Sequence, residues 1–419
     1  MALRPRKFLP LGFLIAFLLV IFSGYTLSLP VTLTFMVPAF EAKPWSSLIK
    51  EFVAKNPDIR IDLKQGQNNL RDLNASALRK GDYDLAYMDI IWVPEFSKEN
   101  LLRDLSERIS NDELAKFLAA DVDGGRYEGG LYRIPFRSDV GMLYYRKDLL
   151  EQAGEDPPET FTDLIKTATA LQKQGAAKWG YVWQGEQYEG LVAMFVEVLQ
   201  GYGGFWINSV TREVGLDQQQ AAVDAVEFLR RTIEQGISPP DVTEYREEQA
   251  HNLFKEGKAV FLRDWPSFWA IANKENSPVR DQIAIKPMVH AEGNSSGACK
   301  GGWGFGIARK TRHPEAAWRA IDFFTSAELE RQFVLQTGYL PSRRSLFIDP
   351  QIVDRYSHFP KLLEVIENSV LRPPIPEYDQ VSKILQRYLS DALTGQLSPE
   401  KAMAAAAQET RQLLAKGVD

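Results

Sequence analysis

Val31-Thr-Leu-Thr-Phe-Met-Val37 is a β-branched, alternating stretch, and this pattern predicts a strand. Two more strands are predicted at Ile59-Arg-Ile-Asp-Leu63 and Tyr83-Asp-Leu-Ala-Tyr-Met88, with helices at residues 45–55 and 69–80 between them. Strands and helices that alternate through short connections are typical of an α/β fold with mostly parallel sheets. Ligands of such sheets bind beyond the carboxyl ends of the strands.

The length of the chain predicts two lobes, because 419 residues exceed what one ordinary hydrophobic core holds. Residues 130–145 are extended and apolar, and we interpret them as the first crossing of the chain between the lobes. We expect an interlobe cleft and several chain crossings. The expected division is residues 31–141 with 299–343 in lobe 1, and residues 142–298 with 344–419 in lobe 2.

The first 30 residues have the pattern of an export signal. Arg4, Arg6 and Lys7 precede a nearly uninterrupted apolar run over residues 8–22. The small residues that follow make a poor cleavage site, so a signal peptide and an uncleaved N-terminal membrane anchor both remain open. Either form predicts a periplasmic or extracytoplasmic protein, secreted or tethered by this segment. Cys299, the only cysteine, is far from the signal, which excludes a cysteine-linked lipid anchor and an intramolecular disulfide.

The charge of the chain disfavours nucleic acid as a partner. The formal net charge is −6, and three of the basic residues lie within residues 1–30, so the remaining chain is more acidic still. Acidic proteins are repelled by nucleic acid and by anionic membrane surfaces. Neutral or cationic small ligands remain open.

Four segments place an aromatic ring beside glycine and a charged or amide side chain. This pairing suits a sugar, because a pyranose has an apolar C–H face for a ring to cover and hydroxyls for carboxylates, amides and guanidinium groups to bind. Any single tryptophan can equally fill a core, so the recurrence is what favours a shared cleft. The segments are residues 90–94, 181–191, 263–269 and 301–306.

Motifs for nucleotide, metal or nucleophilic chemistry are missing from the sequence, and we expect no cofactor. There is no P-loop, Gly301-Gly-Trp-Gly-Phe-Gly306 does not fit the dinucleotide fingerprint, and the four histidines are isolated from one another. The alternative that remains open is an exported glycoside hydrolase, which needs two carboxylates beside the sugar bond. Asp89, just after the third predicted strand, Asp139 and Glu189 are the candidates for that pair.

The motifs of the chain resemble those of extracellular solute-binding proteins of sugar ABC importers, family 1, and in particular the trehalose/maltose-binding group. The resemblance implies a two-lobed periplasmic-binding-protein fold of type II and a monomeric binding protein that is not an enzyme. It also implies that permease subunits with a separate ATPase receive the sugar. The matching stretches are residues 87–92 with 100–105, 134–149, 182–191, 263–266, 301–304 and 371–378.

The resemblance also implies which residues bind the sugar. Carboxylates would accept hydrogen bonds from the sugar hydroxyls, and an amide would accept or donate them. Two tryptophans would cover sugar faces, and two glycines would let the backbone approach the ligand. An arginine would donate a forked pair of hydrogen bonds. The implied ligand-binding residues are Glu41, Asp89, Asp139, Gln184, Glu189, Trp265, Gly301, Gly302, Trp303, Arg372 and Tyr378. Trp183 and Trp269 are better interpreted as core residues.

The chain departs from the family pattern at two points. Arg137 stands where the resemblance leads us to expect an aromatic residue, two positions before Asp139. The lipoprotein cysteine of many relatives is also missing. The resemblance does not decide whether the ligand is trehalose, maltose, sucrose or glucosylglycerol, because each presents a glucosyl ring with similar hydroxyls.

Overall fold

The computed structural model describes residues 30–367 and 369–416. The predicted export signal therefore lies outside the described residues, apart from Pro30. None of the helices in the described part has the length and apolar character that a bilayer crossing requires.

The N-terminal part follows the predicted strand–helix alternation. The first three predicted strands and both helices are confirmed, with bounds that shift by up to three residues, and α3 ends on a left-handed glycine, Gly81. The elements of this part are β1 (Val31–Pro38), η1 (Ala39–Glu41), α2 (Ala42–Lys55), β2 (Ile59–Gly66), α3 (Leu70–Lys80), β3 (Leu85–Asp89), η2 (Ile90–Trp92), α4 (Val93–Lys98), α5 (Asn111–Leu114), α6 (Ala119–Asp123), β4 (Arg126–Tyr127), β5 (Gly130–Leu131) and β6 (Ile134–Val140).

The middle part begins directly after β6, because only Gly141 separates that strand from β7. Of residues 130–145, which the sequence predicts to be extended, all but Tyr132, Arg133 and Gly141 lie in strands. The elements of the middle part are β7 (Met142–Arg146), α7 (Lys147–Ala153), α8 (Phe161–Lys173), β8 (Trp179–Val182), α9 (Glu189–Gly201), α10 (Gln220–Glu234), η3 (Val242–Glu244), α11 (Glu247–Lys255), β9 (Ala259–Asp264), α12 (Phe268–Ala272) and β10 (Ile283–Lys286).

The C-terminal part returns through a long strand and is otherwise helical. The elements are β11 (Cys299–Ile307), α13 (Pro314–Phe324), α14 (Ala327–Thr337), β12 (Leu340–Pro341), η4 (Arg344–Ile348), α15 (Pro350–Arg355), α16 (Phe359–Glu367), β13 (Val370–Leu371), α17 (Tyr378–Leu393) and α18 (Pro399–Lys416).

The sheets are mixed, so the expectation of mostly parallel sheets is wrong. Six of the nine strand pairings in the described part are antiparallel, and only β1–β2, β8–β9 and β11–β13 are parallel. The reason is the path of the chain. It leaves the N-terminal half through β6 and returns beside it through β11, and two neighbouring crossings in opposite directions must pair antiparallel.

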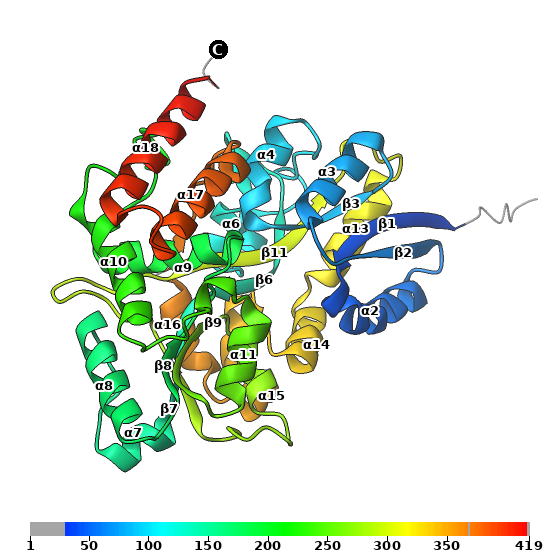
Figure 1. The fold of residues 1–419 in the computed structure, drawn as a ribbon. Coiled ribbons are helices and arrows are strands. Elements are labelled where there is room, and N and C mark those ends of the chain that lie inside the picture. Colours follow the sequence, from blue (N-terminus) through cyan, green and yellow to red (C-terminus); the bar gives the residue numbers. More distant parts are fainter. Residues whose placement is uncertain (1–29, 368, 417–419) are drawn as a thin grey trace, which may run out of the picture.

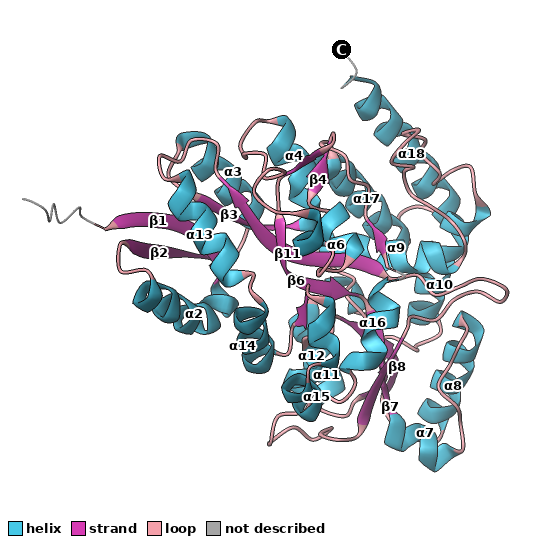
Figure 2. Ribbon diagram, turned by 180° about the vertical axis from the view of Figure 1, so that it is seen from behind, coloured by secondary structure: helices cyan, strands magenta, loops and turns pink. Residues whose placement is uncertain are grey.

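The crossing strands lie between two differently built ends of the molecule. Strands β1 and β2 with α2 lie at one end, and the sheet β10-β7-β9-β8 with α7 and α8 lies at the other, as Figure 1 and, from behind, Figure 2 show. Strands β6 and β11 run between these ends in both views.

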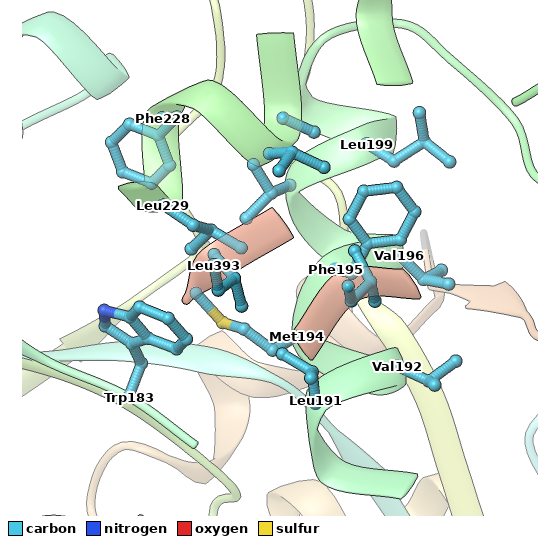
Figure 3. Close-up of a cluster of buried hydrophobic side chains, with 14 of the residues drawn as sticks. Trp183, Leu191, Val192, Met194, Phe195, Val196, Leu199, Phe228, Leu229 and Leu393 are labelled. Carbon is cyan, nitrogen blue, oxygen red and sulfur yellow. The ribbon is translucent and has the colours of Figure 1, made fainter. Parts of the chain in front are cut away.

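Separate hydrophobic cores support the two ends. One gathers Phe35, Trp45 and Phe305 among its buried residues, and another gathers residues of α9, α10, α17 and α18. Figure 3 shows Trp183 pointing into the second core, together with Met194 and Leu229. Its indole N–H is also satisfied internally, by Ser238 at 3.1 Å. The interpretation of Trp183 as a core residue is therefore confirmed.

Candidate functional site

Strand β11 brings together candidate residues that lie far apart in the sequence. In the strand register, Trp303 is opposite Asp89 of β3 on one side and Arg137 of β6 on the other. Gly301 is opposite Asp139. At its beginning, β11 pairs with β13, one residue before Arg372. Strand β11 therefore has three separate stretches of the chain as its neighbours, of which β3 and β6 are antiparallel to it and β13 is parallel.

Gly302 is required by the backbone and by its neighbours. Its φ is +143°, which L side chains rarely adopt, and a Cβ there would lie 2.9 Å from the Arg137 carbonyl oxygen and 3.1 Å from Asp121 Oδ1. A Cβ at Gly301 would lie 3.1 Å from the Cβ of Asp139 and 3.6 Å from the Trp265 ring. The close approach of this glycine pair is thus to protein groups of the neighbouring strand β6, of α6 and of Trp265.

A cluster of charges and rings surrounds Arg137, the residue where the chain departs from the family pattern. Its guanidinium donates to Glu41 Oε1 at 2.9 Å and makes a short contact with Asp139 Oδ2. It also lies 4.3 Å from the centre of the Tyr339 ring and 5.4 Å from that of Trp303. Arg137 therefore neutralises two candidate acids and stacks on two rings at once.

Glu41 is occupied by protein donors on both carboxylate oxygens. Besides Arg137 on Oε1, Oε2 accepts from the Tyr87 hydroxyl at 3.0 Å and from the Trp45 indole N–H at 3.3 Å. The side chain is buried at the start of α2. Glu41 is therefore placed to hold Arg137 in position.

Several polar atoms of this region have no hydrogen-bond partner within the described part of the chain, among them Asp139 Oδ1, Arg137 Nε and Arg372 Nε, and also both carboxylate oxygens of Asp121 and two guanidinium nitrogens of Arg133. As whole residues, Asp139, Arg137 and Arg372 are each more than nine-tenths buried. Unpaired buried polar atoms are costly, so a native protein rarely keeps them without a use.

Burial raises the pKa of Asp139 to about 6, although Arg137 and Lys300 act to lower it.

A second cluster forms around Arg372. Its guanidinium donates to Glu189 Oε1 at 2.6 Å and lies 3.6 Å from Asp89 Oδ1. Glu189 also accepts from the hydroxyls of Tyr378 at 2.5 Å and Ser382 at 2.6 Å. Because Asp89 ends β3 and Glu189 begins α9, Arg372 links β3 to α9.

The rings at the site are held by other rings. Trp303 is only partly buried and packs edge-on against Trp92, with ring centres 5.1 Å apart. Its centre is also 5.2 Å from that of Tyr87. Neighbours of this kind hold the indole in one orientation and leave part of it open to a ligand.

Trp265 is supported from beneath by a buried ion pair. The Arg263 guanidinium lies 4.2 Å from the centre of its ring, and Arg263 Nε donates to Glu197 Oε2 at 2.7 Å. Gln184 is fully buried and bonds both the side chain and the backbone carbonyl of Arg263, so it is placed below the site. A Cβ at Gly141, the residue between β6 and β7, would lie only 1.6 Å from Glu197 Oε1.

His251 of α11 is tied to Trp265 through Asp264. Its Nε2 makes a short contact with Asp264 Oδ2, and Asp264 Oδ1 accepts from the Trp265 backbone N–H at 2.7 Å. The ring is stacked on Phe268 at 4.3 Å. Burial acts to lower the pKa of His251, and so does the nearby Lys255. The negative charges of Asp264 and Glu247 outweigh both effects, so the pKa is raised above the ordinary 6.5.

The pH dependence of this pair can be predicted from the sign of the shift. Because the folded-state pKa is raised, the stabilisation is fully present below pH 6.5 and is lost as the pH rises through the raised value. Between about pH 5.5 and 8, the free energy of unfolding of the wild type should fall by about 1.5–3 kcal/mol relative to that of His251→Gln, the usual contribution of a hydrogen bond to a charged group. Urea unfolding of both proteins across this range measures the difference, and parallel curves would contradict it.

Sequence reasoning noted Arg137 but not its partners, and it missed Tyr339, Ser382 and the Glu197–Arg263 pair. Arg137 and Asp139 are two residues apart on β6, which is a signal that they share a face of the strand. Tyr339 and Ser382 carry no such signal, because they reach the site from elements that the sequence pattern did not connect to it.

This arrangement defines a two-lobed α/β binding protein, with charged groups and aromatic rings gathered where the chain crosses between its halves. The chain belongs to the bacterial extracellular solute-binding protein family, which matches residues 41–330. The predicted resemblance and the two-lobed fold are thereby confirmed.

Individual relatives agree with this membership. A probable ABC transporter-binding protein of Deinococcus radiodurans is 30% identical over 361 residues, which is 84% of this chain and 83% of the relative. A maltotriose-binding protein of Pyrococcus abyssi is 25% identical over 74% of this chain and 66% of its own length. The structure of maltose-bound MalE3 of T. maritima superimposes with a TM-score of 0.86 and 32% identity, covering 91% of this chain and 100% of that one.

Proposed function

We propose that this protein is the substrate-binding component of an ABC importer for a glucose-containing disaccharide or glucoside. The ligand is of the trehalose or maltose kind, with sucrose and glucosylglycerol as further members of the same class. The observation that carries the proposal is the set of unpartnered buried atoms, Asp139 Oδ1, Arg137 Nε and Arg372 Nε, beside the partly exposed rings of Trp265 and Trp303. Sugar hydroxyls both donate and accept hydrogen bonds, and sugar faces cover rings.

In this proposal the lobes close over the ligand. Residues 31–141 with 299–343 form one lobe and residues 142–298 with 344–419 the other. Asp89, Asp139 and Trp303 then contact the sugar from the first lobe, while Glu189, Trp265 and Tyr378 contact it from the second, with Arg372 between them. A ligand that touches both lobes favours the closed state by its additional contacts. Maltose bound to the similar MalE3 supports a glucosyl ligand.

The proposed partners follow from the family. A monomer in the periplasm or outside the cytoplasmic membrane, exported or held by residues 1–30, captures the sugar and delivers it to permease subunits that a separate ATPase drives. The related protein of Deinococcus radiodurans, described as a probable ABC transporter-binding protein, supports this part of the proposal.

Calorimetric titration with maltose, trehalose, sucrose and glucosylglycerol tests the function. At least one should bind saturably with micromolar affinity or better, about −8 kcal/mol, and be recovered unchanged. Trp303→Ala should weaken binding by about tenfold or more, because the ring face that the sugar covers is lost. Trp179→Ala, on β8 away from the site, is the matched control and should bind normally.

Two outcomes would overturn the proposal. Absence of binding by every sugar, with the protein shown to be folded, would remove the transport assignment. Release of glucose over hours, abolished by Asp89→Asn or Asp139→Asn, would instead establish the glycoside hydrolase.

A further inference from the structure

A chain of ion pairs connects α4 with α17 beside the candidate site. Glu377, the residue before α17, accepts from Lys98 Nζ at 3.3 Å on Oε1 and from Arg212 Nη2 at 3.0 Å on Oε2. Lys98 ends α4, and Arg212 belongs to the connection between α9 and α10. Glu377 therefore joins segments from both halves of the molecule.

A second set of ion pairs connects α17 and α4 through Arg71 of α3. Arg71 of α3 lies 3.5 Å from Asp379 of α17 and donates through Nε to Glu95 of α4 at 2.8 Å. Helices α4 and α17 lie side by side in Figure 1 and in the reversed view of Figure 2.

The hydrophobic cores of these helices are separate. Val93 and Phe96 of α4 belong to one buried cluster, whereas Val381 and Leu385 of α17 belong to another. Ile91 of η2 packs against both clusters, but the contacts that reach Glu377 and Asp379 from α4 and α3 are between charges, which can separate into water at a lower cost than apolar surfaces can.

We propose that Glu377 is a positioning residue that holds the two lobes closed over the sugar, through its ion pair with Lys98 on the other lobe, while Arg212 of its own lobe holds the Glu377 carboxylate in place. This inference rests on the proposed function and on the proposed division into lobes. Glu377 is only 11% exposed in its side chain, and the next residue, Tyr378, bonds Glu189 of the site, so the ion pairs are coupled directly to the ligand groups.

The expected effect follows from the population of the closed state. Ligand affinity is reduced by the fraction of molecules that are binding-competent, so a tenfold smaller closed population raises the Kd tenfold. Glu377→Gln removes the charge that Lys98 and Arg212 share, and because Lys98 is half exposed we expect the Kd for maltose to rise by about two- to fivefold. Salt should weaken the wild type more than the variant, because it screens the pairs that the variant lacks.

The first measurement uses the ligand-free protein. Fluorescent labels at Lys50→Cys on α2 and Lys173→Cys on α8 report the distance between the halves, because both positions are exposed and the native Cys299 is buried. In low salt the labels should be closer in the wild type than in Glu377→Gln. At about 1 M salt, where the Debye length falls to about 3 Å, the two proteins should become equal.

The second measurement is calorimetric binding of maltose to both proteins and to Glu409→Gln. That control removes the same charge from a surface pair with Arg387 on α17, far from α4, and should bind like the wild type. In a double-mutant cycle, Lys98→Met should add little to Glu377→Gln, because the two changes remove one interaction.

Each arm can fail separately. If no sugar binds the wild type, the proposed function fails, but the label distances still test the role of Glu377. If Glu377→Gln matches the wild type in label distance and in maltose Kd, or if only its melting temperature falls, Glu377 has a structural role and the inference is overturned.

Discussion

Replacement of Glu197 with alanine should lower the free energy of unfolding by about 3–5 kcal/mol, the usual cost of leaving a buried charge without its partner. Both side chains of the Glu197–Arg263 pair are fully buried, and Arg263 bonds Glu197 through Nε at 2.7 Å. When the carboxylate is removed, the Arg263 guanidinium keeps one side-chain acceptor among the described residues, the amide oxygen of Gln184 at 3.3 Å. Urea unfolding followed by tryptophan fluorescence measures the change.

The control is an exposed pair of the same chemistry. Glu409→Ala breaks the pair with Arg387, whose side chains are 47% and 39% exposed, and should cost less than about 1 kcal/mol. Replacing both partners of the buried pair, as in Glu197→Leu with Arg263→Met, should restore much of the stability, because no isolated charge is left. A loss below about 1 kcal/mol for Glu197→Ala would contradict the prediction.

Arg372→Ala should weaken sugar binding by about a hundredfold or more, equivalent to about 2.7 kcal/mol. The side chain is almost fully buried, it bonds Glu189 at 2.6 Å, and it lies 3.6 Å from Asp89, so its loss removes the group between two candidate ligand acids. A forked guanidinium also binds pairs of hydroxyls in a way that a single ammonium cannot match. Calorimetric titration with the sugar that binds the wild type measures the effect.

Two further variants separate binding from folding. Arg372→Lys keeps the charge without the fork and should bind with intermediate affinity. Arg387→Ala removes an exposed arginine of α17 and should leave the affinity unchanged. If Arg372→Ala binds as tightly as the wild type at an unchanged melting temperature, Arg372 is not a ligand group.

Much of the candidate site could be predicted from the sequence, because its residues lie in short recognisable stretches. Asp89 follows a strand whose pattern is plain, and Gly301-Gly-Trp303 and Leu371-Arg372 lie in motifs of the family. Their juxtaposition could not be predicted in the same way. Asp89 and Trp303 are opposite each other only because β11 returns beside β3.

The partners of the charged residues could not be predicted from the sequence either. Arg137 was visible as a departure from the family, but its bonds to Glu41 and Asp139 depend on how η1 and β6 meet. Gln184 looked like a ligand group in the sequence, whereas the structure places it beneath Trp265 with Arg263. Residue type and spacing do not distinguish an amide that faces a ligand from one that satisfies a buried charge.

By itself the sequence determined the repeated strand–helix units, the apolar crossing over residues 130–145 and the membership of the family. These features depend on the spacing of side chains along contiguous chain, which is written directly in the order of residues. Only the tertiary structure decided the antiparallel pairing of β6 and β11, the ion pairs of Arg137 and Arg372, and the charges that join α4 to α17. Those depend on which distant segments meet, and that follows from the packing of the whole chain.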